Sequence, residues 1–194
     1  SSALALEIER NKVGFYGYNG GANRTYGFLN DPSLPNYVSN PGPAWASATF
    51  LEIVGDIRAA IVALRSKSKD QIDPKTTPLT LAVASSCVDY LSVTNTLGTQ
   101  SVQQWIDQTY PNIRVVSAPE LDAANGSANV FYLYAESVND SSTDGGKVWI
   151  QVVPAKFQVL GVQQNTKSYE EDYVNATAGL MLKRPYAIVR YSGI

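Results

Sequence analysis

The stretch from Val13 to Pro32, VGFYGYNGGANRTYGFLNDP, constrains the fold most. Glycine and asparagine, which tolerate positive φ, make up much of it, and aromatic residues stand between them. A segment of this composition bends repeatedly and still has rings to bury. A short helical pattern, SSALALEIERN, precedes it, and Asn11 and Gly14 predict the end of that helix. We therefore expect a structured bend that redirects the chain from a helix into a core.

The glycines at 14, 17 and 20 have a spacing that superficially suggests a phosphate-binding loop. Such a loop follows a buried strand and leads into a helix. Here a charged helical segment precedes the glycines and a proline-rich loop follows them. The context therefore favours glycines with a structural role over nucleotide binding.

The longest helix is predicted from about residue 47 to residue 66. It follows an extended connection rich in proline, residues 30–43. An apolar stripe at helical spacing runs along it, formed by Phe50, Leu51, Ile53, Val54, Ile57, Ile61 and Leu64. Gly55 lies inside this helix and suggests close packing against another element.

The remainder of the chain has mostly strand character. Residues 79–84 and 113–116 are predicted strands, separated by two short helices at 85–91 and 101–110, which gives a small α/β module. Residues 130–135 and 148–153 predict a hairpin, and its connection 139–146, NDSSTDGG, is predicted to be an exposed, mobile tip. Residues 157–163, 169–178 and 181–190 also read as extended.

Composition limits what this chain can do. Its 194 residues, 44% hydrophobic, are enough for one domain or two small intertwined ones, and the net charge of −2 gives no support for a strongly basic nucleic-acid binder. Histidine, the commonest general base and metal ligand, is absent. Cys87 is the single cysteine, so neither an intrachain disulfide nor a thiolate zinc cluster can form. No apolar run reaches the length needed to span a membrane.

Two short segments are candidates for chemistry. Ser85-Ser86-Cys87 lies at a strand-to-helix turn, where a nucleophile could be exposed, but the flanking glycines of that motif and a histidine base are missing. Glu170 and Asp172 would share one face of a strand, but no second ligand cluster accompanies them. We therefore predict no catalytic, cofactor-binding or metal-binding residue. Aromatic residues in loops, among them Tyr16, Tyr18 and Trp45, favour a protein interface over ordinary core packing.

Taken in order, the motifs resemble the major capsid proteins of tailed phages, whose shell fold encapsulins share. IERNKVGFYG followed by GFLNDPSLP resembles the end of the family's spine helix and its turn, and FLEIVGDIRAAIVALRSKS resembles its next long helix. LTLAVASSCVDYL with IRVVSAPEL resembles the axial-domain core, and RPYAIVRYSGI resembles the C-terminal strand. The resemblance implies a mixed α+β fold, with a peripheral domain at 1–76 and 161–194 and an axial domain at 77–160.

The resemblance also implies a function. The chain would be a structural, non-enzymatic virion protein, made in the bacterial cytoplasm, that assembles with copies of itself into the hexamers and pentamers of an icosahedral head. No cofactor is implied. Other partners would be scaffold, portal and further head proteins, and packaged DNA through weak non-specific contact. The 139–146 tip would lie near the capsomer axis.

The family's N-terminal arm and extended loop do not appear in this sequence. Because the SSALALEIERN helix has no N-cap, we expect Ser1 to lie inside a longer helix. No crosslinking residue is carried over from the family. Two rival functions remain: a small hydrolase using the Ser85–Cys87 turn or Glu170 and Asp172, and a phage tail or fibre binding module. The module would be rich in β-strands and trimeric, and would lack the helix at 47–66.

Overall fold

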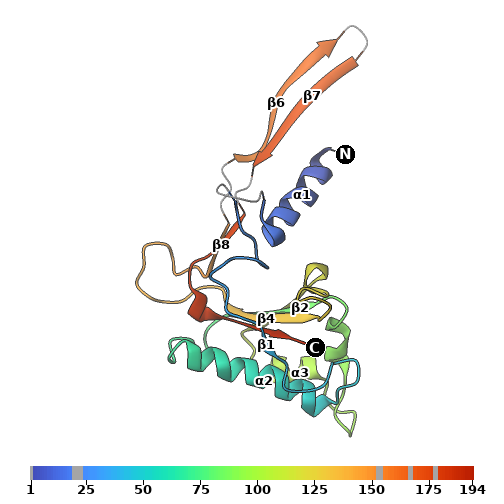
Figure 1. The fold of residues 1–194 in the computed structure, drawn as a ribbon, viewed down its shortest axis with the longest axis vertical. Helices are drawn as coiled ribbons and strands as arrows, with labels where there is room; N and C mark the ends of the chain where they lie inside the picture. Colours follow the sequence, from blue (N-terminus) through green and yellow to red (C-terminus); the bar gives the residue numbers. More distant parts are fainter. Residues whose placement is uncertain (1, 19–23, 152–154, 166–167, 177–178) are drawn as a thin grey trace. The chain divides into compact units, whose positions relative to one another are not determined.

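The structure is a computed structural model. It describes the backbone of residues 2–18, 24–151, 155–165, 168–176 and 179–194, and the side chains of residues 8–18, 24–151 and 179–194. By packing, the chain divides into two compact units. One comprises residues 1–33 and 149–183, and the other comprises residues 34–148 and 184–194. Each unit is described by itself below, and Figure 1 labels many of the helices and strands.

The second unit is built on a five-stranded mixed sheet with the order β1-β9-β4-β2-β3. Its strands are β1 (Val38–Ser39), β2 (Leu79–Ala84), β3 (Ile113–Ala118), β4 (Val130–Ala135) and β9 (Ile188–Ser192). β2 runs parallel to β3 and antiparallel to β4, and β4 runs antiparallel to β9. All six residues of β2, LTLAVA, are buried, as expected for the middle of a covered sheet.

The connection between β2 and β3 confirms the predicted α/β module. It contains a 3₁₀ helix, η1 (Val88–Ser92), and the helix α3 (Val102–Thr109). Ser101 starts α3 with a capping box, because its side chain accepts from the Gln104 backbone N–H while the Gln104 side chain accepts from the Ser101 N–H. Shorter 3₁₀ helices follow β3 (η2, Pro119–Leu121) and precede β9 (η3, Pro185–Ala187).

The predicted long helix is α2 (Phe50–Lys67), which packs against β4, β9 and α3 (Figure 1). Thr49 and Glu52 form its capping box. The predicted apolar stripe is buried, except that Leu51 is 76% exposed. The prediction of close packing at Gly55 is wrong within the described chain: Gly55 is exposed, and a Cβ placed there would meet nothing within 4 Å.

The predicted hairpin of residues 130–135 with 148–153 is also wrong. Both edges of β4 are occupied, one by β2 and the other by β9. β5 (Trp149–Gln151) instead pairs antiparallel with β8 (Leu180–Leu182) in the first unit. The extended segments predicted further along are strands: β6 (Ala155–Asn165) and β7 (Ser168–Ala176) form a long antiparallel hairpin (Figure 1).

The opening bend closes the end of α1 (Ser2–Tyr16). This helix runs past the predicted stop at Asn11 and Gly14 and ends at Gly17, whose φ is +71°. Each carbonyl of its last turn has a donor: Val13 O accepts from Gly17 N, Gly14 O from Phe28 N, Phe15 O from Leu29 N, and Tyr16 O from Asn30 Nδ2. The returning chain thus satisfies the acceptors that a helix end otherwise leaves free.

Gly27 is the residue that permits this close return. A Cβ on Gly27 would lie 2.4 Å from the carbonyl carbon of Phe15. The rings of Phe15 and Phe28 then meet edge to face, with centroids 5.8 Å apart. The described part of the bend therefore has a structural role, as predicted, while residues 19–23 lie outside the described chain.

Candidate functional site

The Ser85–Cys87 turn is held in place by contacts with neighbouring segments. Cys87 is 3% exposed, and its Sγ contacts Asn129 Nδ2 at 3.3 Å and the Ile194 carbonyl at 3.8 Å. Ser86 donates through Oγ and through its backbone N–H to Asp122 Oδ1, at 2.9 and 3.0 Å. These contacts tie the turn to the loop after β3. Ser86 therefore has a carboxylate acceptor in Asp122, but none of these contacts supplies a third group that would orient Asp122 as a general base.

The carboxylate pair proposed for metal or acid–base chemistry lies in β7. The backbone register places Glu170 opposite Gln163 and Asp172 opposite Gly161 in β6. Their side chains lie outside the described residues. Among the side chains that the structure does describe, no group of three histidines, cysteines or carboxylates is placed to hold a metal ion.

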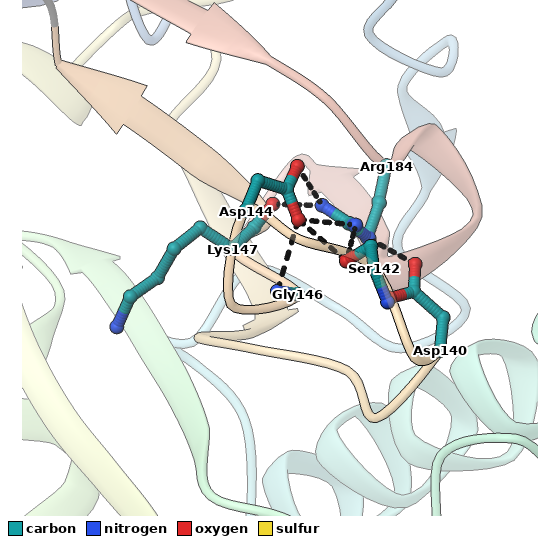
Figure 2. A network of polar contacts seen from close by, with 6 residues as sticks. All are labelled: Asp140, Ser142, Asp144, Gly146, Lys147 and Arg184. Atoms are coloured by element: carbon teal, nitrogen blue, oxygen red, sulfur yellow. Dashed lines mark hydrogen bonds and ion pairs between the residues drawn. The ribbon is translucent and has the colours of Figure 1, made fainter.

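The most developed polar site contains residues 139–146, the segment predicted to be an exposed, mobile tip. Figure 2 shows how Arg184 reaches into it. Arg184 is 7% exposed; its Nε donates to Asp140 Oδ2 at 2.7 Å, while Nη2 and Nη1 donate to Asp144 Oδ1 and Oδ2 at 2.8 and 3.2 Å. It also donates to Ser142 Oγ and to the carbonyl of Lys147. All three guanidinium nitrogens are therefore used, with a two-pronged pair to Asp144.

The backbone of this loop is held as well. Ser142 N donates to Asp140 Oδ1, and Gly146 N donates to Asp144 Oδ1. Gly146 has a φ of +66°, and a Cβ there would collide with the carbonyl oxygen of Val138. We call residues 137–147 together with Arg184 the clamped loop.

Charge pairing dominates the electrostatics of the clamped loop. Hydrogen bonds from Arg184 and Ser142 hold the pKa of Asp140 at about 2 and the pKa of Asp144 well below its usual range. The same carboxylates raise the pKa of Arg184 further. Because the carboxylates are occupied by Arg184, the clamped loop suits a contact surface of fixed shape better than acid–base or metal chemistry.

Sequence reasoning found the loop and its exposure but missed the clamp. Arg184 lies 40 residues after Asp144 in the chain, and no local pattern links them. The one available signal in the sequence is the Asp140–Asp144 pair, which has no basic residue near it in the chain except Lys147.

The aromatic residues predicted to favour an interface differ in their exposure. Tyr16 and Tyr18 are 51% and 63% exposed, whereas Trp45 is a core residue, 1% exposed and stacked on Phe131.

A second arginine fastens the loop that precedes β1. Arg190 in β9 donates through Nε to the Pro35 carbonyl at 2.7 Å and through Nη1 to Tyr132 Oη at 3.2 Å. Its guanidinium carbon also lies 3.9 Å from the centre of the Tyr37 ring, a cation–π contact. Burial raises the pKa of the Tyr132 hydroxyl above its ordinary value. The residues here are saturated by one another, which is the pattern of a structural tie.

The comparisons with known proteins agree with this picture. The family model described as Pa193 gp26 major capsid protein matches residues 1–193. The structure is similar to the capsid of Myoviridae phage XM1, with a TM-score of 0.74 and 16% identity over 100% of this chain and 63% of that one. It is also similar to a virus-like particle from Pyrococcus furiosus, with a TM-score of 0.55 and 15% identity over 84% of this chain and 58% of that one. No curated protein sequence matches.

These findings fix the family and the fold. The chain spans less than two thirds of either structural relative, and at such low identity the two structures bear on the fold alone. Among the described residues, no helix is long and apolar enough to cross a bilayer. A match that runs almost from end to end is enough for membership, and the mixed α+β fold agrees with it: this chain belongs to the Pa193 gp26 family of major capsid proteins.

Proposed function

We propose that this chain is the shell-forming part of a major capsid subunit, which assembles with copies of itself into the hexamers and pentamers of an icosahedral head enclosing DNA. The observation that carries the proposal is the family match over residues 1–193. The phage capsid fold at a TM-score of 0.74 supports it independently of sequence identity. The protein would be made in the host cytoplasm and end in the virion.

The charge balance suits repeated self-association. Fifteen basic and seventeen acidic residues leave a formal net charge of −2. Copies of a nearly neutral subunit repel one another weakly at close range. The same balance supports only weak, non-specific contact with packaged DNA, because strong phosphate binding depends on clustered basic residues. Scaffold, portal and other head proteins are further proposed partners.

The clamped loop is our candidate for the capsomer axis, where loops of several subunits would meet. It is exposed for most of its length, and its shape is fixed by Arg184. An ordered loop loses less conformational entropy in a contact than a mobile one. The peripheral domain at 1–76 and 161–194 and the axial domain at 77–160 stay a prediction, because the two compact units follow packing and not position in a capsomer.

Electron microscopy of the complete gene product, expressed alone or with its neighbouring head proteins, tests the proposal. We expect closed shells built of hexamers and pentamers. A stable monomer that forms no particles at high concentration under either condition would overturn it. Hydrolytic turnover that disappears in a Ser86→Ala variant would instead favour the hydrolase.

A further inference from the structure

An open apolar groove of about 600 Å³ lies where the start of α2 meets the loop after η1. Its lining consists of Thr49, Phe50, Leu51 and residues 93–97. Leu97 and Leu51 are 84% and 76% exposed, the two largest exposures among the large hydrophobic side chains that the structure describes. We call these lining residues the Leu51–Leu97 patch. Two leucines this open at one groove are an unfavourable surface for a lone subunit.

The turn that carries Leu97 is well fixed. Gly98 N donates to Asn95 O at 2.9 Å, and Asn95 N donates to Gln100 O at 2.9 Å. The Asn95 side chain also accepts from Thr99 N at 3.0 Å, and Gly98 takes a φ of +67°. Leu97 therefore stands out from a hydrogen-bonded turn as a preformed knob beside the groove. Little ordering entropy opposes its insertion into a partner.

Both segments that form the patch are free of charge. Residues 32–51 and 90–106 contain no Asp, Glu, Lys or Arg, although 32 of the 194 residues are charged. These two runs meet at the groove. The nearest acid in sequence, Glu52, accepts from Thr49 N at 2.7 Å as part of the α2 cap. Two copies of this patch would therefore meet with no charged residue in the lining of either groove, and charge depletion is typical of the centre of protein interfaces.

Gly55 gives a second reason to expect a partner here. It lies one turn after Leu51 on the same exposed side of α2, and nothing stands within 4 Å of where its Cβ would be. Glycine inside a helix is unfavourable, and no contact within the described chain explains it. An outside backbone approaching the helix closely would explain it.

We propose that the Leu51–Leu97 patch is a contact between two copies of this chain related by a local two-fold axis, with Leu97 of each copy lying in the groove of the other. The knob and the groove belong to one patch, so a two-fold rotation brings each knob onto the facing groove. This contact rests on the proposed shell-forming function and assigns to it one subunit interface. Such a contact removes Leu51 and Leu97 of both copies, four leucines in all, from water.

Cysteine crosslinking of the complete gene product tests the geometry. Leu97→Cys is treated with a short bis-maleimide, and Ser66→Cys serves as the control, since residue 66 is exposed on α2 about 22 Å from Leu51 at ~1.5 Å per residue. Cys87 is buried and stays unlabelled in both. A two-fold contact predicts a covalent dimer for L97C without larger species. Dimer no more abundant than in S66C, or a ladder to larger oligomers, overturns the contact.

Placing a charge in the Leu51–Leu97 patch tests whether assembly depends on this contact. Leu97→Asp is expected to lower the yield of assembled particles by about tenfold or more, and Val62→Asp, at a 56% exposed position further along α2, is expected to leave it unchanged. If wild-type protein forms shells and L97D forms them equally well, the contact is wrong and the proposed function stands. If wild-type protein forms no shells, the proposed function fails, and L97C crosslinking at high concentration still decides the contact.

Discussion

Asp56 is a buried carboxylate that holds the loop before α2 in the second unit. It lies in α2 and is 1% exposed. Its Oδ2 accepts from Trp45 Nε1 at 2.9 Å and from Asn40 Nδ2 at 2.8 Å, and its Oδ1 accepts from the Gly42 backbone N–H at 3.0 Å. A Cβ on Gly42 would lie 2.8 Å from Oδ1, so the loop fits tightly around the carboxylate.

We expect Asp56→Asn to destabilise this unit by about 2–4 kcal/mol. The amide keeps the volume of the carboxylate, but only one of its two ends can accept. If its oxygen faces Trp45 and Asn40, its NH₂ faces the Gly42 N–H, which loses its acceptor at a cost of about 1–3 kcal/mol. The two remaining bonds fall from charge-assisted to neutral strength, about 1 kcal/mol each. Relief from burying a charge offsets part of this sum.

Urea unfolding followed by tryptophan fluorescence measures the effect, and Trp45 is itself a reporter. With a slope of about 2 kcal/mol/M, a loss of about 3 kcal/mol lowers the midpoint by about 1.5 M. Asp107→Asn is the matched control: it makes the same chemical change at an exposed position in α3, and we expect a shift within about 0.5 kcal/mol. A D56N midpoint indistinguishable from that of D107N would refute the reasoning.

Four further substitutions probe other parts of the chain. Arg184 lowers the pKa of Asp140 to about 2. The stabilisation from this ion pair is therefore complete above the unfolded-state pKa of about 4 and is lost as the pH falls toward 2. Carboxyl NMR titration should show the low pKa of Asp140, and Arg184→Gln should return it toward about 4. Gly27→Ala should destabilise the first unit by about 1–3 kcal/mol, while Gly14→Ala, with open space at its Cβ, should stabilise α1 by about 0.5–1 kcal/mol, both measured by thermal unfolding. Gly55→Ala should likewise raise subunit stability by about 0.5–1 kcal/mol yet reduce particle yield, and equal yields would count against a close partner there.

The elements that local patterns could predict are those with a clear period. The 50–67 helix and the buried strands 79–84 and 130–135 follow directly from their apolar spacing. Leu51 is apolar and falls within the predicted stripe, yet it follows Phe50 by 100° around the helix and is 76% exposed. Periodicity thus located the helix and missed the residue that its outer face presents.

Pairings between distant segments could not be predicted. The expected hairpin assumed that strands close in sequence pair with each other, but β9, about 55 residues further on, takes the free edge of β4. The clamp on residues 139–146 has the same origin, because Arg184 comes from the end of the chain. Local sequence carries no information on either contact, since both depend on how the whole chain closes.

Asp56, Arg184 and Arg190 together explain how a unit with long loops presents fixed surfaces. Each is under 9% exposed and hydrogen-bonds a loop distant in sequence: residues 40–45, 140–147 and the Pro35 carbonyl. Burying a charge is expensive unless its bonds are satisfied, so each tie holds only in one geometry. Loops fixed before association lose little entropy when they meet a neighbour. For a protein that must repeat one contact many times, these three charges are therefore best understood as shaping surfaces in the free subunit that assembly then uses.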